Sequence, residues 1–189
     1  AGPVVVAAVK MPRLLKLRLK NHPKPLRDSK KLSPKNRKLW FDYVKNHSDI
    51  KYALARVWPK TIDEINISRA ANRAASRAFD GILRMRSGDA AVLRVYLDGG
   101  LFLTEAKNNA AKSAKTVIRG DEKINAVKLA SIMAKVSRDK YMCELHKKVP
   151  RYYFNEHKGY GTKKHFASLK SCGPSRFHRL TFIKNCLNI

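Results

Sequence analysis

Acidic residues are scarce in this chain of 189 residues. Asp and Glu together number 14 against 41 Lys and Arg, which gives a formal net charge of +27 at pH 7. A surplus of this size favours polyanionic partners, and their binding weakens as the salt concentration rises. We therefore expect a nucleic acid as the partner, and not a membrane surface.

Cysteines and long apolar runs are also few. The three cysteines, Cys143, Cys172 and Cys186, are an odd number without the spacing of a disulfide framework, which favours a reducing, cytoplasmic compartment. Cys143 and His146 form a Cys-x-x-His pair without the second pair that a zinc site needs. No segment approaches the ~20 apolar residues that span a bilayer. The sequence thus predicts neither a disulfide scaffold, nor structural zinc, nor a membrane span.

The remaining pattern predicts an α/β fold, because segments of strand-like and helix-like period alternate along the chain. We expect strands at residues 4–9, 14–19, 50–58 and 116–118, and one that ends at Asp98. Helices are expected after Ser33-Pro34, over 62–85, and after Gly120. Residues 1–149 are interpreted as the core domain and 150–189 as a C-terminal helical extension.

Two aspartates stand where the pattern calls for apolar side chains. Asp98 closes an apolar run and precedes Gly99-Gly100, the place where α/β sheets present ligand-binding groups. Asp139 lies at the edge of the apolar stripe of a long predicted helix. A turn cap at Asp98 and a solvated helix face at Asp139 are the alternatives. Because a partly buried carboxylate is costly without a partner, we expect the two to share a metal ion.

Two basic segments are candidates for nucleic-acid contact. Tyr160 stands between two glycines and is flanked by lysines, which suits stacking on a sugar or base. The alternative is a tyrosine that fills a gap between the last helices. Ser29 and Lys30 lie just ahead of a helix start, where hydroxyl, ammonium and amide groups can bind a phosphate. A solvated basic loop is the alternative there.

Taken in order, these segments resemble ribonuclease HII, the type 2 ribonuclease H, over nearly the whole chain. The matching stretches are AGPVVVAA at 1–8, DSKKLS at 28–33, IDEINI at 62–67, LDG at 97–99, AKVSRD at 134–139, HKGYGT at 157–162 and HRLTF at 178–182. The resemblance implies a ribonuclease H-like mixed sheet flanked by helices, with a C-terminal helical extension. It also implies endonucleolytic hydrolysis of RNA in RNA–DNA hybrids, including single ribonucleotides embedded in DNA.

The same resemblance implies a cofactor and a set of site residues. Two divalent ions, Mg²⁺ or Mn²⁺, are held by four carboxylates and leave 5′-phosphate and 3′-hydroxyl ends. Asp98 corresponds to a metal ligand, Asp139 to the fourth carboxylate, and Tyr160 to the residue that stacks on the deoxyribose beside the ribonucleotide. Positions that contact phosphates of the DNA strand correspond to Ser29, Lys30 and Asn66.

The chain departs from the family pattern at its start. In the family, a central strand carrying Asp-Glu-Ala-Gly-Arg-Gly precedes the segment matched by Ala1-Gly2-Pro3, and it supplies two of the four carboxylates. We therefore expect a truncated chain whose first central strand is missing. Asp121-Glu122 starts a helix where the family has Gly-Asp, and is not taken as a replacement. A second departure is Lys128-Leu129, where the family prefers small residues.

Two functions follow from these observations. The first is a monomeric, metal-dependent ribonuclease H that acts on RNA–DNA hybrids or on DNA with embedded ribonucleotides, with no membrane partner. The alternative is a non-catalytic basic protein that binds hybrid or duplex nucleic acid. A basic ribosomal or architectural protein would leave the spacing of Asp98, Asp139 and Tyr160 unexplained.

Overall fold

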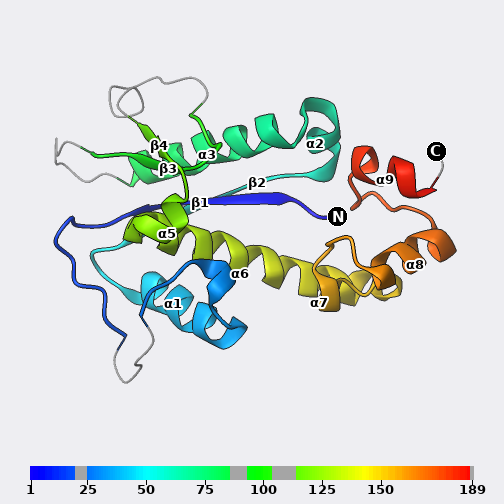
Figure 1. Ribbon diagram of the computed structural model, residues 1–189, viewed down its shortest axis with the longest axis horizontal. Helices are drawn as coiled ribbons and strands as arrows, with labels where there is room; N and C mark the ends of the chain where they lie inside the picture. Colours follow the sequence, from blue (N-terminus) through cyan, green and yellow to red (C-terminus); the bar gives the residue numbers. More distant parts are fainter. Residues whose placement is uncertain (20–24, 86–92, 104–113, 188–189) are drawn as a thin grey trace.

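The computed structural model describes residues 1–19, 25–85, 93–103 and 114–187 (Figure 1). The strands are β1 (Val4–Lys10), β2 (Lys51–Val57), β3 (Tyr96–Asp98) and β4 (Lys115–Val117). The helices are η1 (Ser29–Lys31), α1 (Pro34–Asn46), α2 (Pro59–Ile65), α3 (Ile67–Arg84), α5 (Gly120–Lys123), α6 (Asn125–Lys148), η2 (Pro150–Tyr152), α7 (Phe154–His157), α8 (Lys163–Cys172) and α9 (Leu180–Leu187).

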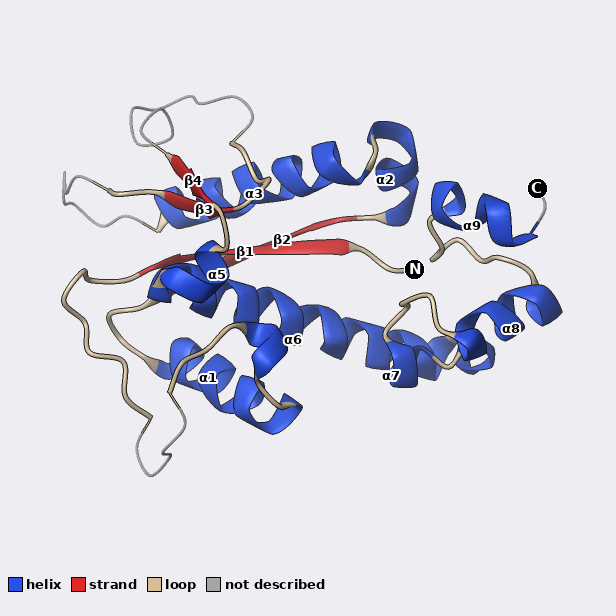
Figure 2. Ribbon diagram, in the orientation of Figure 1, coloured by secondary structure: helices blue, strands red, loops and turns tan. Residues whose placement is uncertain are grey.

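Strands β1 and β2 form an antiparallel pair that lies between two helices. Their register runs from Val4 opposite Val57 to Lys10 opposite Lys51. Helix α3 covers one face of the pair and α6 covers the other (Figure 2). The alanine-rich stripe of α3 allows close packing, and Ala70, Ala74 and Ala78 are all buried. The layers predicted from the sequence are therefore present around this pair of strands.

Strands β3 and β4 form a separate parallel pair, with Asp98 as the last residue of β3. Within the described residues, neither strand is hydrogen-bonded to β1 or β2. Every residue of β1 is only half-buried, whereas a buried strand was expected. The half-burial accords with β1 having a strand partner on one edge only among the described residues.

Two predicted elements differ from the structure. Residues 14–19 form a turn and an extended segment instead of a strand, because Leu15 and Leu17 pack singly on the core around Trp40 while Leu14 is 89% exposed. The helix expected over 62–85 is interrupted at Asn66, whose φ of 66° cannot continue a helix. The end of that expected helix at Ser87-Gly88 lies outside the described residues.

The start of α1 agrees with the helix predicted after Ser33-Pro34. The Ser33 hydroxyl accepts a hydrogen bond from the Asn36 amide at the start of α1, and Pro34 takes the first helical position.

The short helices after Pro150 return to the start of the chain, where the Gly2 amide donates to the Phe177 carbonyl at 2.8 Å. The boundary at 149/150 stays a prediction. In the described part of the chain, no helix is long and apolar enough to cross a membrane.

Candidate functional site

The carboxylate of Asp98 lies against the first turn of α5. The backbone N–H of Asp121 donates to Asp98 Oδ1 at 3.3 Å. Gly120 lies directly beside Asp98, since a Cβ at that position would be in ordinary van der Waals contact with it, 3.4 Å from Asp98 Oδ1 and 3.5 Å from Asp98 Cα. The end of β3 and the start of α5 therefore place two aspartates next to each other, 23 residues apart in the chain.

The surroundings of Asp121 disfavour its charged form. Asp121 is only 8% exposed, and this burial raises the pKa of its carboxyl. The negative charges of Asp98 and Asp28 raise the same pKa. Lys30 lowers the same pKa from 3.9 Å away. Because the charged form is disfavoured by its neighbours, a cation at this point would stabilise both carboxylates.

Asp139 is not brought to Asp98. It accepts a hydrogen bond from Lys135 Nζ at 2.9 Å, one turn back along α6. Val127 and Asp98 both lie beside Gly120. Asp139 follows Val127 by twelve residues, which is about 18 Å along the axis of α6. The helical stripe gives a position around the helix axis but not the distance along it. Asp121, which the sequence interpretation set aside, occupies the place beside Asp98.

Tyr160 presents its ring to solvent and does not fill a gap, since the residue is 54% exposed. Lys135 Nζ and the Arg138 guanidinium each lie 5.1 Å from the ring centroid. Lys135 is eight residues beyond Val127, about 12 Å along α6.

The three expected phosphate contacts differ in what they expose. The side chain of Lys30 is 82% exposed, beside Asp121. Ser29 is buried, with its hydroxyl 2.8 Å from that of Ser131 on α6. Asn66 caps α3, where its Oδ1 accepts from the Arg69 amide at 3.0 Å. Lys30 is thus the one cation of the three, and the other two side chains have structural partners.

The departure at Lys128-Leu129 fits the fold. Leu129 is fully buried in the cluster that contains Trp40 and Val44, so the larger side chain fills core space between α1 and α6.

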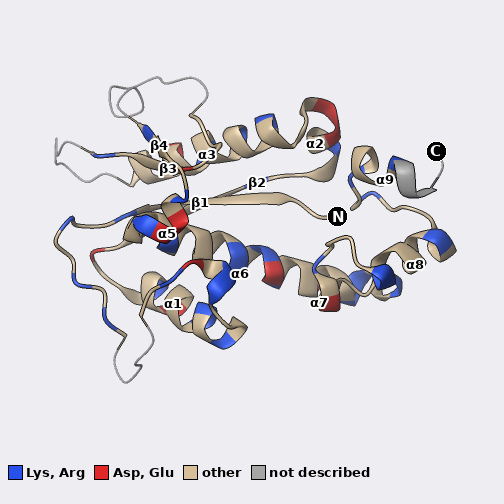
Figure 3. Cartoon of the chain, in the orientation of Figure 1, with Lys and Arg blue, Asp and Glu red and all other residues tan. Residues whose placement is uncertain are grey.

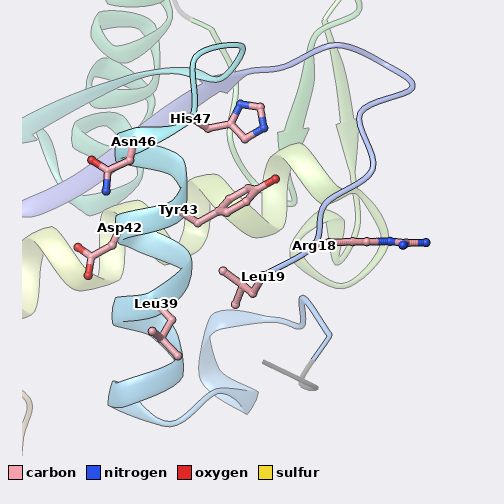
Figure 4. Close-up of a pocket in the computed structure, with 7 residues that line it drawn as sticks. All are labelled: Arg18, Leu19, Leu39, Asp42, Tyr43, Asn46 and His47. Carbon is pink, nitrogen blue, oxygen red and sulfur yellow. The ribbon is translucent and has the colours of Figure 1, made fainter. Parts of the chain in front are cut away.

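Asp98 and Asp121 fit a divalent ion in kind, because carboxylate oxygens are the donors that Mg²⁺ and Mn²⁺ prefer. Among the described residues, no three His, Cys, Asp or Glu side chains gather closely enough to hold a metal. The open cleft beside α1 lies elsewhere and is not part of this site (Figure 4). Its lining residues are Arg18, Leu19, Leu39, Asp42, Tyr43, Asn46 and His47.

Lys and Arg residues lie on α1, α6, the α5 region and α8 (Figure 3), and Lys30 lies 3.9 Å from Asp121. A pair of carboxylates beside basic side chains and an exposed aromatic ring is what a metal-dependent nuclease uses to hold its substrate. The site thus has the features of that class of enzyme.

Comparisons with known proteins specify the class. The Ribonuclease HII family profile matches residues 1–185. Ribonuclease HII of Caldicellulosiruptor bescii is 40% identical over 189 residues, which cover 100% of this chain and 83% of that protein. Ribonuclease HII of Endomicrobium trichonymphae is 40% identical over 185 residues, 96% of this chain and 79% of that protein. The chain belongs to the ribonuclease HII family, whose enzymes cleave RNA in RNA–DNA hybrids.

Solved structures show the same fold. Ribonuclease H2 from Pyrococcus horikoshii superposes with a TM-score of 0.61 at 22% identity, covering 99% of this chain and 92% of that one. The ribonuclease HII of the PCNA complex from Archaeoglobus fulgidus gives 0.60 at 22% identity, with 98% and 89% covered. The expected ribonuclease H-like α/β fold is confirmed.

Proposed function

We propose that this chain hydrolyses the RNA strand of hybrids, and single ribonucleotides embedded in DNA, at a metal site built on Asp98 and Asp121. The observation that carries the proposal is the hydrogen bond from the Asp121 amide to Asp98 Oδ1, in a chain with few acids. The Asp98 charge also raises the pKa of the Asp121 carboxyl, as expected of two neighbouring carboxylates. Asp139, paired with Lys135, is assigned no metal in this proposal.

Each residue has a defined task. Asp98 and Asp121 would hold Mg²⁺ or Mn²⁺, which when bound activates water and stabilises the leaving 3′ oxygen, so that 5′-phosphate and 3′-hydroxyl ends result. Lys30, exposed beside Asp121, offsets the charge of an approaching phosphate. Tyr160, exposed and flanked by cations, stacks on a sugar of the bound strand.

Two further carboxylates belong to this proposal. The family strand with Asp-Glu-x-Gly-Arg-Gly would supply them, and the printed sequence does not contain that motif. Support for its place comes from β1, which among the described residues pairs with β2 on one edge only. We propose that full two-metal hydrolysis needs this strand beside β1.

A second candidate function is binding without hydrolysis. It is favoured by the net charge of +27 and by the finding that, within the described residues, no three His, Cys, Asp or Glu side chains gather closely enough to hold a metal ion. In this case the basic surface would hold hybrid or duplex nucleic acid, with an affinity that falls steeply with salt.

Cleavage of a labelled duplex with one embedded ribonucleotide distinguishes the two functions. The 189-residue chain is assayed alone and with the family strand added ahead of Ala1, each with Mg²⁺, Mn²⁺ or EDTA. The first function predicts metal-dependent cleavage by the extended form. Asp98→Asn and Asp121→Asn should each lower it by at least ~100-fold, more than outer-shell changes usually do. Asp139→Asn is the matched control. Tight binding by both forms with cleavage by neither would support the second function instead.

A further inference from the structure

Three histidines form a buried cluster behind the Tyr160 loop. His157 ends α7, His165 lies on α8, and His178 precedes α9; they are 8%, 2% and 2% exposed. The rings of His157 and His165 are stacked at 4.5 Å, and His165 Nε2 lies 3.1 Å from His178 Nε2. Phe154, fully buried, packs on all three rings. None of these histidines has a role in the proposed chemistry.

The hydrogen bonds allow only one arrangement of protons on the neutral rings. His165 Nδ1 lies 2.9 Å from the Tyr160 carbonyl oxygen, which can only accept, so Nδ1 carries the proton. His178 Nδ1 accepts from the Ser175 amide at 3.0 Å, so the proton of His178 is on Nε2. His178 Nε2–H therefore donates to the bare Nε2 of His165. A continuous relay runs from Ser175 through both rings to Tyr160.

The neutral state is favoured by the surroundings. Burial lowers the pKa of His165 to about 4, and burial together with the neighbouring His165 lowers that of His178 to about 4. All four ring nitrogens of the pair have partners within hydrogen-bonding distance. Because each nitrogen is already used, the pair is not available to a metal ion.

The loop is also fixed on its other side. His157 Nδ1 accepts from the Gly159 amide at 3.1 Å, and its Nε2 lies 2.8 Å from the Tyr152 carbonyl, to which it donates. Gly159 has φ of 78°, a conformation that favours glycine. The Gly159 amide and the Tyr160 carbonyl are thus each hydrogen-bonded to an imidazole ring. The side chain of Tyr160 extends toward Lys135 and solvent.

We propose that His165 and His178 are positioning residues for substrate recognition: their relay of fixed tautomers sets the backbone of Tyr160 and so the stacking surface offered to the bound strand. This inference rests on the proposed role of Tyr160. The histidines touch no substrate themselves. They act by removing alternative loop conformations, which lowers the entropy cost of stacking when the strand binds.

The tautomers can be measured without any substrate. Long-range ¹H–¹⁵N correlation spectra at pH 7 should show neutral rings with the proton on Nδ1 of His165 and on Nε2 of His178. A proton on Nε2 of His165, or a charged ring in either residue, would overturn the relay. This result is independent of whether Tyr160 contacts nucleic acid.

The positioning role is tested with matched variants. His165→Asn keeps an N–H where Nδ1–H stands, whereas His165→Phe removes it. Tyr152→Phe is the control, because the Tyr152 hydroxyl donates to the Gly173 carbonyl at 2.9 Å in the same cluster without reaching Tyr160. Fluorescence anisotropy gives the affinity for a duplex with one embedded ribonucleotide, and thermal melting verifies folding of each variant.

His165→Phe should weaken binding by on the order of tenfold, which is within the range for loss of one stacked base. His165→Asn keeps the Nδ1–H donor but loses the Nε2 acceptor for His178, so it should weaken binding less than His165→Phe does. Tyr152→Phe should stay within about twofold of the parent, well short of the loss expected for His165→Phe. In a Tyr160→Ala background, His165→Phe should have no further effect, because the surface that it positions is gone. An equal effect in both backgrounds would show a merely structural role and overturn the proposal. Unchanged affinity in Tyr160→Ala alone would overturn the proposed contact of Tyr160, and the tautomer spectra would then stand by themselves.

Discussion

Mild acid should destabilise this protein through the buried histidine pair. An unfolded imidazole titrates near pH 6.5, whereas burial holds the pKa of both His165 and His178 at about 4. Between these values the unfolded chain takes up protons that the folded chain does not. Stability contributed by the neutral rings is therefore complete above pH 6.5 and is lost as the pH falls toward 4.

The size of the effect follows from the difference in pKa. Each pKa unit is worth about 1.4 kcal/mol, so one ring contributes about 3 kcal/mol at full titration. The rings are in contact and titrate as a pair, so we expect the pair to contribute at least about 3 kcal/mol to the free energy of unfolding. Two other groups, His157 and the Ala1 amine, contribute to the lowering of both pKa values, while the hydrogen bonds to the Tyr160 and Ser175 backbone oppose it. A loss of about 3 kcal/mol is a large part of the 5–15 kcal/mol typical of a folded protein.

Urea unfolding at intervals between pH 7 and 4 measures the effect. The free energy of unfolding should fall from pH 7 downward, because burial also lowers the pKa of the Ala1 amine to about 5, and it should fall more steeply below pH 6.5, where the histidine pair adds its share. This added slope should be reduced in His165→Phe but retained in Tyr152→Phe. Glu122 and Glu156, whose pKa values are lowered by Lys31 and Lys164, lose their contribution only below about pH 4.5. A flat profile from pH 6.5 to 4.5, or an unchanged slope in His165→Phe, would refute the reasoning.

Two other predictions concern the carboxylate site. Asp121→Asn should raise the melting temperature of the metal-free chain, because burial, Asp98 and Asp28 all disfavour the Asp121 charge; a lower melting temperature in calorimetry would contradict this electrostatic account. Lys30→Ala should weaken duplex binding and reduce the slope of log affinity against log salt by about 1, as expected for one lost phosphate contact. An unchanged slope in a salt titration would show that Lys30 does not contact phosphate.

Local features of the sequence were sufficient for much of the fold. The Ser33-Pro34 start of α1, the alanine face of α3 and the place of Asp98 at the end of a strand each depend on residues close in the chain. Residues 14–19 were misinterpreted, because apolar alternation in a single segment does not show whether a neighbouring strand is available to pair with it.

The site depended on contacts that sequence periodicity does not contain. The helical angle placed Asp139 at the edge of an apolar stripe, but angle alone gives no position along the axis, and Asp139 lies about 18 Å farther along α6 than Val127, which contacts Gly120. Asp121 carried a usable signal: it follows Gly120 at a helix start, in a chain with few acids. Its pairing with Asp98 depends on how β3 and α5 pack. The histidine relay, in turn, depends on tautomers that only tertiary contacts define.

The most direct test of the central claim is a titration of the ¹⁵N-labelled chain with Mg²⁺, followed by amide chemical shifts. If Asp98 and Asp121 form the metal site, the largest changes will centre on Asp98, Gly120 and Asp121 and will be lost in Asp121→Asn. The amide of Asp139, about 18 Å farther along α6 than Val127, should stay unchanged. Shifts centred on Asp139, or the same response in Asp121→Asn as in the parent chain, would contradict the account.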